Sequence, residues 1–120
     1  MREKKKEKGA KHKEINKYEI MWMFVMFDLP VTSKEERKAA TDFRCFLLDN
    51  GFAKAQYSVY IRVFSGKDAC QKYYKIIERA VPPAGKVEIV LITDMQYSNI
   101  VTFEGREKSK PKQPEQLLLF

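Results

Sequence analysis

The sequence predicts an α+β domain in which one antiparallel sheet carries both of its helices on the same face. Three observations support this prediction: a nearly continuous apolar run at Glu19–Phe27, helical periodicity in two later segments, and alternating strand patterns around them. In chain order they give β-α-β-β-α-β with a short trailing strand, which is the ferredoxin-like arrangement. The chain of 120 residues is long enough for one such domain.

The first strand and the first helix have clear boundaries. Glu19–Phe27 is apolar at almost every residue, which is typical of a central strand covered on both faces, and Asp28-Leu29-Pro30 ends it. Ser33 followed three residues later by Glu36 forms a capping box that starts a helix. Gly51 suits the left-handed backbone position that closes this helix.

The rest of the domain follows the same logic. Two strands, a helix stopped by two prolines and a fourth strand are predicted in turn at Phe52–Gln56, Ser58–Phe64, Lys67 to Pro82, and Lys86–Asp94. A last edge strand is predicted at Asn99, Ile100, Val101, Thr102 and Phe103. No helix remains to cover the second face of the sheet, so we expect a second copy of the chain to cover it in a homodimer.

The chain divides into three parts. Residues 1–17 form a basic leader that is too polar to fold, residues 18–105 form the domain, and residues 106–120 form a Pro-containing tail. The net charge is +7, of which +5 lies in the leader, so the charge suits polyanion binding or solubility equally well. The tail ends in an apolar peptide made of Gln116, Leu117, Leu118, Leu119 and Phe120.

Composition excludes several classes of protein. No apolar run could span a bilayer or serve as a signal peptide, so we expect a cytoplasmic protein that does not contact membranes. Cys45 and Cys70 are predicted to be buried thiols, and the single histidine, His12, lies in the leader. There is no Gly-rich phosphate loop, nucleophile elbow or zinc-ligand spacing, which leaves carboxylates and metal for any catalysis.

Asp28 is the main candidate for such chemistry. It ends an apolar strand, where a carboxylate needs a partner. It could be a turn residue that accepts bonds from nearby amides. Alternatively, the two Asp28 side chains of a twofold dimer could converge and hold Mg²⁺ against a phosphodiester.

Four basic residues are candidates for nucleic-acid binding. Arg62 lies on a predicted strand and could contact phosphate or serve as an edge-strand charge against aggregation. Lys34, Arg37 and Lys38 lie at the start of the first helix, where they could hold phosphate or form an ordinary solvated face. The aromatic residues of the first strand, including Trp22, are predicted to be core residues and not base-stacking platforms.

Several segments resemble one family, the small CRISPR-associated endoribonucleases, and in particular its type II members. These segments are VMFDLP (Val25–Pro30), EERKAATDFRCFLLDNGF (Glu35–Phe52), AQYSVYIRVF (Ala55–Phe64) and GKVEIVLITDMQY (Gly85–Tyr97). The resemblance covers roughly Tyr18 to Gly105 and depends on the order and spacing of the segments together. The Lys-rich leader has no counterpart in it.

The resemblance implies more than the residues alone do. It implies a symmetric dimer with exchanged C-terminal strands, located between integrase dimers that insert foreign DNA as new spacers. It implies that Asp28 is the Mg²⁺ ligand of an endoribonuclease whose activity varies among members and is not generally needed for spacer acquisition. It also implies contacts to the duplex DNA backbone by Lys34, Arg37, Lys38, Arg106 and Lys108.

We therefore expect a dimeric scaffold of the spacer-integration complex with metal-dependent nuclease chemistry at Asp28, on RNA or DNA. The alternatives are a free-standing, toxin-like ribonuclease and a non-catalytic RNA-binding module. The tail peptide Gln116–Phe120 is expected to dock on the integrase. It could instead fold back on its own dimer, or bind the bacterial sliding clamp, whose short Gln-Leu-x-Leu-Phe ligands it resembles.

Overall fold

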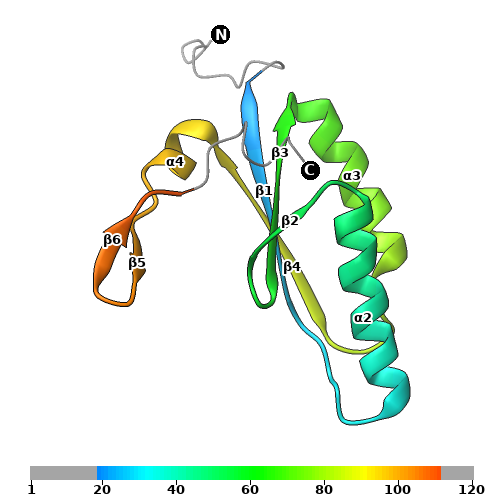
Figure 1. The fold of residues 1–120 in the computed structure, drawn as a ribbon. Helices are drawn as coiled ribbons and strands as arrows, with labels where there is room; N and C mark the ends of the chain where they lie inside the picture. Colours follow the sequence, from blue (N-terminus) through cyan, green and yellow to red (C-terminus); the bar gives the residue numbers. More distant parts are fainter. Residues whose placement is uncertain (1–18, 112–120) are drawn as a thin grey trace, which may run out of the picture.

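The computed structural model of the protein describes residues 19–111 and has the predicted ferredoxin-like fold. Its first six elements are β1 (Ile20–Asp28), α2 (Lys34–Asp49), β2 (Ala53–Gln56), β3 (Val59–Ser65), α3 (Lys67–Ala80) and β4 (Lys86–Thr93). The four strands form an antiparallel sheet in the order β2-β3-β1-β4, and α2 and α3 lie together on one face of it (Figure 1). The leader at residues 1–17 and the peptide Gln116–Phe120 lie outside the described residues.

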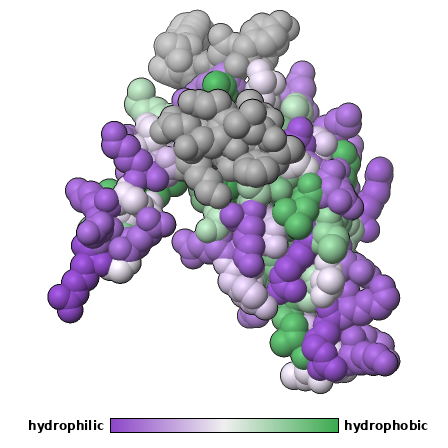
Figure 2. All heavy atoms as spheres, in the orientation of Figure 1, coloured by the Kyte–Doolittle hydropathy of each residue, from purple (hydrophilic) through white to green (hydrophobic). Residues whose placement is uncertain are grey.

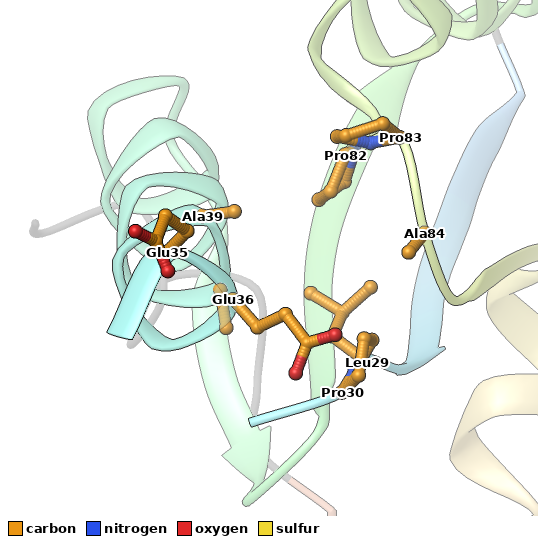
Figure 3. Close-up of a pocket in the computed structure, with 9 residues that line it drawn as sticks. Leu29, Pro30, Glu35, Glu36, Ala39, Pro82, Pro83 and Ala84 are labelled. Atoms are coloured by element: carbon orange, nitrogen blue, oxygen red, sulfur yellow. The ribbon is translucent and has the colours of Figure 1, made fainter. Parts of the chain in front are cut away.

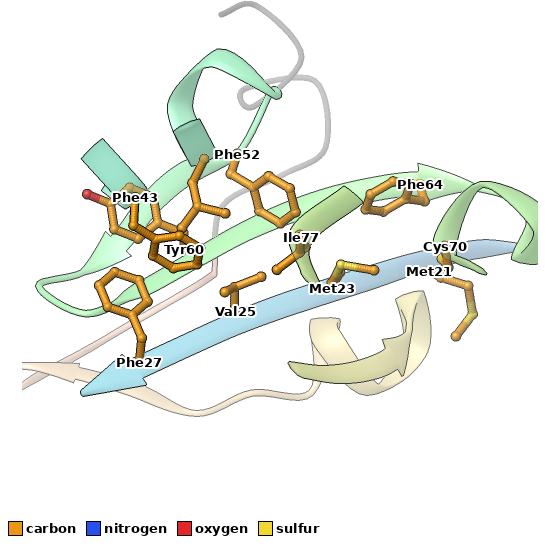
Figure 4. Packing of buried hydrophobic residues seen from close by; sticks show 11 residues of the cluster. Met21, Met23, Val25, Phe27, Phe43, Phe52, Tyr60, Phe64, Cys70 and Ile77 are labelled. Atoms are coloured by element: carbon orange, nitrogen blue, oxygen red, sulfur yellow. The ribbon is translucent and has the colours of Figure 1, made fainter. Parts of the chain in front are cut away.

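The main core lies between the sheet and these two helices. Alternate residues of β1 point into it, and Figure 4 shows them meeting side chains from α2, β3 and α3. The buried residues of this core include Met21, Met23, Val25, Phe27, Phe43, Leu47, Phe64 and Ile77. Because side chains alternate along a strand, the other residues of β1 must face the opposite side of the sheet.

Local signals set the ends of α2 as predicted. The Ser33 hydroxyl accepts a hydrogen bond from the Glu36 amide at 3.0 Å, and the Glu36 carboxylate accepts one from the Ser33 amide at 3.1 Å. This reciprocal pair is the expected capping box. At the other end of the helix, Gly51 has a φ of 85°, the left-handed conformation that glycine adopts readily.

A short helix that the sequence analysis missed lies on the second face of the sheet. α4 (Asp94–Ser98) begins where the fourth strand was expected to end, and the side chains of Thr93 and Gln96 form a capping box at its start. Tyr97 of α4 stacks on Trp22, which is completely buried. The expectation that no helix of this chain covers that face was therefore wrong for the part around Trp22.

The end of the described chain forms a hairpin, where the sequence predicted an edge strand and an extended linker. Asn99–Val101 is not a strand, and β5 (Thr102–Glu104) pairs with β6 (Glu107–Ser109) instead of with the main sheet. Gly105, with a φ of 66°, supplies the left-handed conformation that a two-residue hairpin turn requires. The hairpin stands out from the body as a mostly hydrophilic projection (Figures 1 and 2).

Two further expectations concern the cysteines and the membrane. Cys70 is buried, as predicted, but Cys45 is exposed because it lies on the outward face of α2. Within residues 19–111, no helix has the length and the apolar character needed to cross a bilayer.

Candidate functional site

The candidate site is centred on Asp28, the last residue of β1 and an exposed one. Met21, Met23, Val25 and Phe27 point into the core under the helices, whereas Trp22 and Phe24 belong to the cluster on the opposite face. The same alternation places Asp28 on the face that lies opposite to α2 and α3. This is the face that the sequence analysis assigned to a second copy of the chain.

The Asp28 carboxylate has no hydrogen-bond or ion-pair partner within residues 19–111. Lys86 is its neighbour across the β1–β4 pairing, but the two side chains do not form a salt bridge. The amides of the turn after Asp28 bond elsewhere, since those of Thr32 and Ser33 donate to Glu36. The alternative of an amide-bonded turn aspartate is thus not observed in the described part of the chain.

Glu36, in the first turn of α2, is already engaged in the helix cap. The Thr32 hydroxyl donates to its carboxylate at 2.7 Å, and the backbone amides of Thr32 and Ser33 donate to the same oxygen. These bonds, that of the Thr32 hydroxyl foremost, lower the pKa of Glu36 below its ordinary value of 4.5. Glu36 is therefore a charged structural residue and not a free metal ligand.

The backbone of Asp28 is supported by a close approach that the sequence analysis missed. Gly85, in the loop before β4, has a φ of 102°, and a Cβ there would lie 2.8 Å from the Asp28 carbonyl oxygen. It would also lie 2.8 Å from Leu29 Cδ2 and 3.0 Å from Pro30 Cδ. Only glycine fits without displacing the end of β1. The sequence signal was a glycine that comes directly after Pro82-Pro83-Ala84 and directly before a strand.

A small apolar cavity of about 120 Å³ lies beside this support. Leu29 and Pro30 form one wall and Pro82 and Pro83 another, while Glu35 and Glu36 of α2 stand along its side (Figure 3). Its polar side chains are few, so it does not resemble a catalytic pocket. Its walls hold the turn after Asp28 against α2.

The described residues do not form a metal site by themselves. Residues 19–111 contain no group of three or more His, Cys, Asp or Glu side chains that could hold an ion. Mg²⁺ nevertheless needs only one or two protein carboxylates, because it retains several waters. The free, exposed carboxylate of Asp28 suits that ligand set if a second carboxylate comes from another chain.

The basic residues predicted for nucleic-acid binding do not form one patch. Arg37 and Lys38 are exposed at the start of α2; Arg37 Nη1 donates to the carbonyl oxygen of Val31 at 3.2 Å, and Lys38 pairs with Asp42 at 2.9 Å. Lys34 is exposed beside them. Arg106 and Lys108 belong to the hairpin, which lies on the other side of the sheet from α2 (Figure 1).

Arg62 has a structural position. β3 lies between β2 and β1, so Arg62 is not on an edge strand, and that alternative was wrong. Arg62 Nη1 donates to the carbonyl oxygen of Asn50 at 3.1 Å, at the end of α2. Its guanidinium carbon also lies 4.5 Å from the ring centroids of both Phe64 and Tyr73. Arg62 therefore connects the end of α2 to α3 on the face of the sheet that both helices cover.

Sequence reasoning also missed an exposed aromatic residue near Asp28. Tyr57 lies in the turn between β2 and β3, within the segment AQYSVY, and has cations from α2 and β2 beside its ring. Tyr57 lies between β2 and β3, where the alternation of buried and exposed residues along a strand does not apply. Its exposure could therefore not be deduced from the sequence pattern.

Comparison with known proteins identifies the family. The family model described as "CRISPR associated protein Cas2" matches residues 21–100. A protein of Paracidovorax avenae named "CRISPR-associated endoribonuclease Cas2" is 47% identical over 104 residues, which cover 86% of this chain and 96% of that protein. Relatives with the same name occur in Flavobacterium psychrophilum, 36% identical over 87% of this chain and 90% of theirs, and in Parvibaculum lavamentivorans, 39% identical over 83% and 100%.

The family match at residues 21–100 spans nearly all of β1 and continues through α4, the part of the chain that holds Asp28 and its supports. Both the family model and relatives of well over 30% identity cover most of the chain. The resemblance found in the sequence is therefore confirmed, and the chain belongs to the Cas2 family of CRISPR-associated proteins.

Proposed function

We propose that this chain is the dimeric scaffold subunit of a CRISPR spacer-integration complex and that Asp28 is the metal ligand of its nuclease site. The observation that carries the proposal is the Asp28 carboxylate, which has no partner among residues 19–111 and lies at a strand end on the open face of the sheet in a member of this family. The named relatives are endoribonucleases by description, which supports nuclease chemistry in this chain.

The proposed dimer is supported by an unpaired strand edge and by exposed apolar side chains. Among residues 19–111, β4 is an outer strand of the main sheet, with a row of unpaired backbone groups along one side. Val90 of β4 is 41% exposed, and Val101 and Phe103 at the hairpin are each 62% exposed, so these side chains offer apolar area to a partner. We propose that β5 of each protomer pairs with the outer strand of the other, which would cover these residues.

In such a dimer the two Asp28 side chains would hold one Mg²⁺ between them. The bound ion would supply positive charge to a phosphate group and lower the pKa of a water molecule. The role of the chain itself is positional. Gly85 and the walls of the neighbouring cavity fix the turn after Asp28, and the β1–β4 pairing fixes its backbone.

Duplex DNA would be held through its phosphates by the cations at the start of α2 and in the hairpin. Lys34, Arg37 and Lys38 are exposed there, as are Arg106 and Lys108. We do not assign Arg62 to this surface, because its guanidinium is occupied by Asn50 and two aromatic rings. Reversing Arg37 and Lys38 to Glu should weaken binding of duplex DNA and reduce its salt dependence, since fewer counterions are released.

A matched control for that experiment lies on α3. Lys72 and Lys75 are exposed cations outside the proposed surface, and reversing them changes the net charge by the same amount. Equal losses of affinity in the two double variants would reduce the α2 assignment to a general charge effect.

The tail peptide Gln116–Phe120 lies outside the described residues, and its docking on the integrase remains a proposal from sequence. Truncation after Pro114 separates the three alternatives. Loss of integrase binding by an intact dimer supports docking, whereas loss of dimer stability supports folding back. If integrase binding persists, a pull-down with the sliding clamp tests the third alternative.

A free-standing ribonuclease is the second candidate; the descriptions of the relatives support its ribonuclease activity but also name an association with CRISPR. The third candidate, an RNA-binding module that stacks bases on its sheet, is disfavoured because Trp22 is buried beneath Tyr97. The experiment that tests the proposed nuclease is cleavage of RNA and DNA with and without Mg²⁺ by the wild type and by Asp28→Ala. Cleavage that persists unchanged in Asp28→Ala would refute the assignment of the carboxylate.

A further inference from the structure

Tyr57 is an exposed aromatic side chain in a position where packing does not require one. It lies in the turn between β2 and β3 and is 70% exposed, the highest value for any aromatic residue between residues 19 and 111. Exposed aromatic rings beside cations are common binding sites for unpaired nucleotide bases, because the base stacks on the ring and the cations bind the phosphates. The surroundings of Tyr57 match that combination.

Two cations flank the ring. The guanidinium carbon of Arg44 lies 5.0 Å from the Tyr57 ring centroid, and Lys54 Nζ lies 5.1 Å from it. Neither cation forms a salt bridge within the described residues. Arg44 Nε is buried and lacks a hydrogen-bond partner there, so the described residues leave this guanidinium with hydrogen-bonding capacity to spare. Both cations are available to an anion brought next to the ring.

The ring lies at the same end of the sheet as Asp28. The amide of Phe27 donates to the Ser58 carbonyl oxygen at 3.1 Å, and these residues directly precede Asp28 and follow Tyr57. Arg44 belongs to α2 and also lies 5.8 Å from the Phe27 ring, so Tyr57 is on the helix side of the sheet. Asp28 faces the opposite side, which leaves Tyr57 clear of the face proposed for the dimer.

We propose that Tyr57, Arg44 and Lys54 form a subsite for single-stranded nucleic acid, in which an unpaired base stacks on the Tyr57 ring. The base displaces the exposed Lys54 ammonium from the ring. Lys54 and Arg44 then bind the adjoining phosphates. The strand then continues around the end of the sheet toward Asp28. This inference deepens the proposed nuclease function and rests on it for the identity of the neighbouring site.

The test measures binding without cleavage, so that it is independent of the nuclease assignment. A single-stranded RNA of about 12 nucleotides carrying one 2-aminopurine is titrated with the full chain in EDTA, and its affinity and fluorescence quenching are recorded. The variants are Tyr57→Phe, which keeps the ring, and Tyr57→Ala. Leu48→Ala is the control, since Leu48 is an exposed apolar residue of α2 and does not belong to this cluster.

Tyr57→Ala should weaken binding about tenfold and abolish the quenching, whereas Tyr57→Phe and Leu48→Ala should stay within about twofold of the wild type. A duplex of the same sequence should lose little affinity in Tyr57→Ala, because its bases are already stacked. The proposal is overturned if Tyr57→Ala binds the single strand normally, or if the duplex loses as much affinity as the single strand. An equal response with single-stranded DNA supports base stacking that ignores the sugar.

If Tyr57→Ala still cleaves RNA through Asp28 while binding single strands normally, the nuclease stands and only the subsite falls. If Asp28→Ala retains full cleavage while Tyr57→Ala loses binding, the subsite stands without its proposed neighbour.

Discussion

The indole of Trp22 and the phenol of Tyr97 stack face to face, with ring centroids 3.7 Å apart and an angle of 7° between their planes. The Trp22 Nε1–H also donates to Asp94 Oδ1 at 2.8 Å, so both ends of α4 are fastened to the same side chain of β1. This contact closes part of the second face of the sheet. It also determines where the chain leaves the sheet toward the hairpin.

Replacing Tyr97 by Ala should therefore destabilise both the fold and the proposed dimer. Loss of a buried aromatic side chain costs about 3–5 kcal/mol, and the hairpin would lose its fixed starting point. Tyr97→Phe keeps the ring and should cost less. Urea unfolding followed by Trp22 fluorescence, with sedimentation of the same samples, measures both effects. Equal stability of Tyr97→Ala and the wild type would show that the stack contributes nothing.

Gly85→Ala should displace the backbone at Asp28 and so reduce both stability and the cleavage that depends on Asp28. The added Cβ meets the Asp28 carbonyl oxygen at 2.8 Å, and the φ of 102° is strained for alanine, so we expect a loss of about 1–3 kcal/mol in stability. Cleavage dependent on Asp28 should fall further than the folded fraction does.

Gly105→Ala provides the matched control for this prediction. Gly105 also has a positive φ, 66°, but a Cβ there meets nothing within 4 Å. It should show the conformational cost without the effect on cleavage. If the two variants behave alike, close packing against Asp28 has no functional role.

The capping box at the start of α2 predicts that the stability of the fold decreases at acidic pH. The pKa of Glu36 is lowered in the folded protein, so its stabilising effect is complete above its unfolded value, near 4.5, and is lost as the pH falls through the folded value. Ser33→Ala should cost about 1 kcal/mol at neutral pH. In Glu36→Gln the stability should change less between pH 6 and pH 3 than in the wild type, because the carboxylate that takes up a proton on unfolding is absent; thermal melts at the two pH values measure this change.

The two cysteines should differ in reactivity. Cys45 is exposed, whereas Cys70 is buried, and desolvation raises the pKa of the Cys70 thiol and keeps it protonated. A thiol reagent at pH 8 should therefore modify one cysteine quickly in the native protein and the second only after denaturation. Peptide mapping that finds Cys70 modified first would contradict the burial described here.

Local signals predicted most of the fold, whereas long-range contacts decided the rest. Ser33 with Glu36 and Gly51 mark the ends of α2 within a few residues of sequence, so these boundaries could be recognised. Helix α4 has only five residues, which is too short for a helical periodicity to show. Its capping box at Thr93 and Gln96 begins on the last residue of β4, so this segment was interpreted as the end of the strand.

In the candidate site, too, local signals were predictable from the sequence and long-range contacts were not. The position of Asp28 at a strand end followed from the apolar run before it. Its support by Gly85 joins residues 57 positions apart, and the contact of Arg62 with Asn50 depends on how α2 packs against β3. Periodicity alone does not specify such contacts.

In the proposed dimer, two Asp28 carboxylates, one from each protomer, hold one divalent ion. The most direct measurement is the stoichiometry of Mn²⁺ binding to purified protein, by calorimetry, with the mass of the same sample determined by sedimentation against the 14.1 kDa chain. We expect a dimer that binds one ion per two chains, and an Asp28→Ala dimer that remains folded and binds none at this site. A monomer, one ion per chain, or undiminished binding by Asp28→Ala would contradict it.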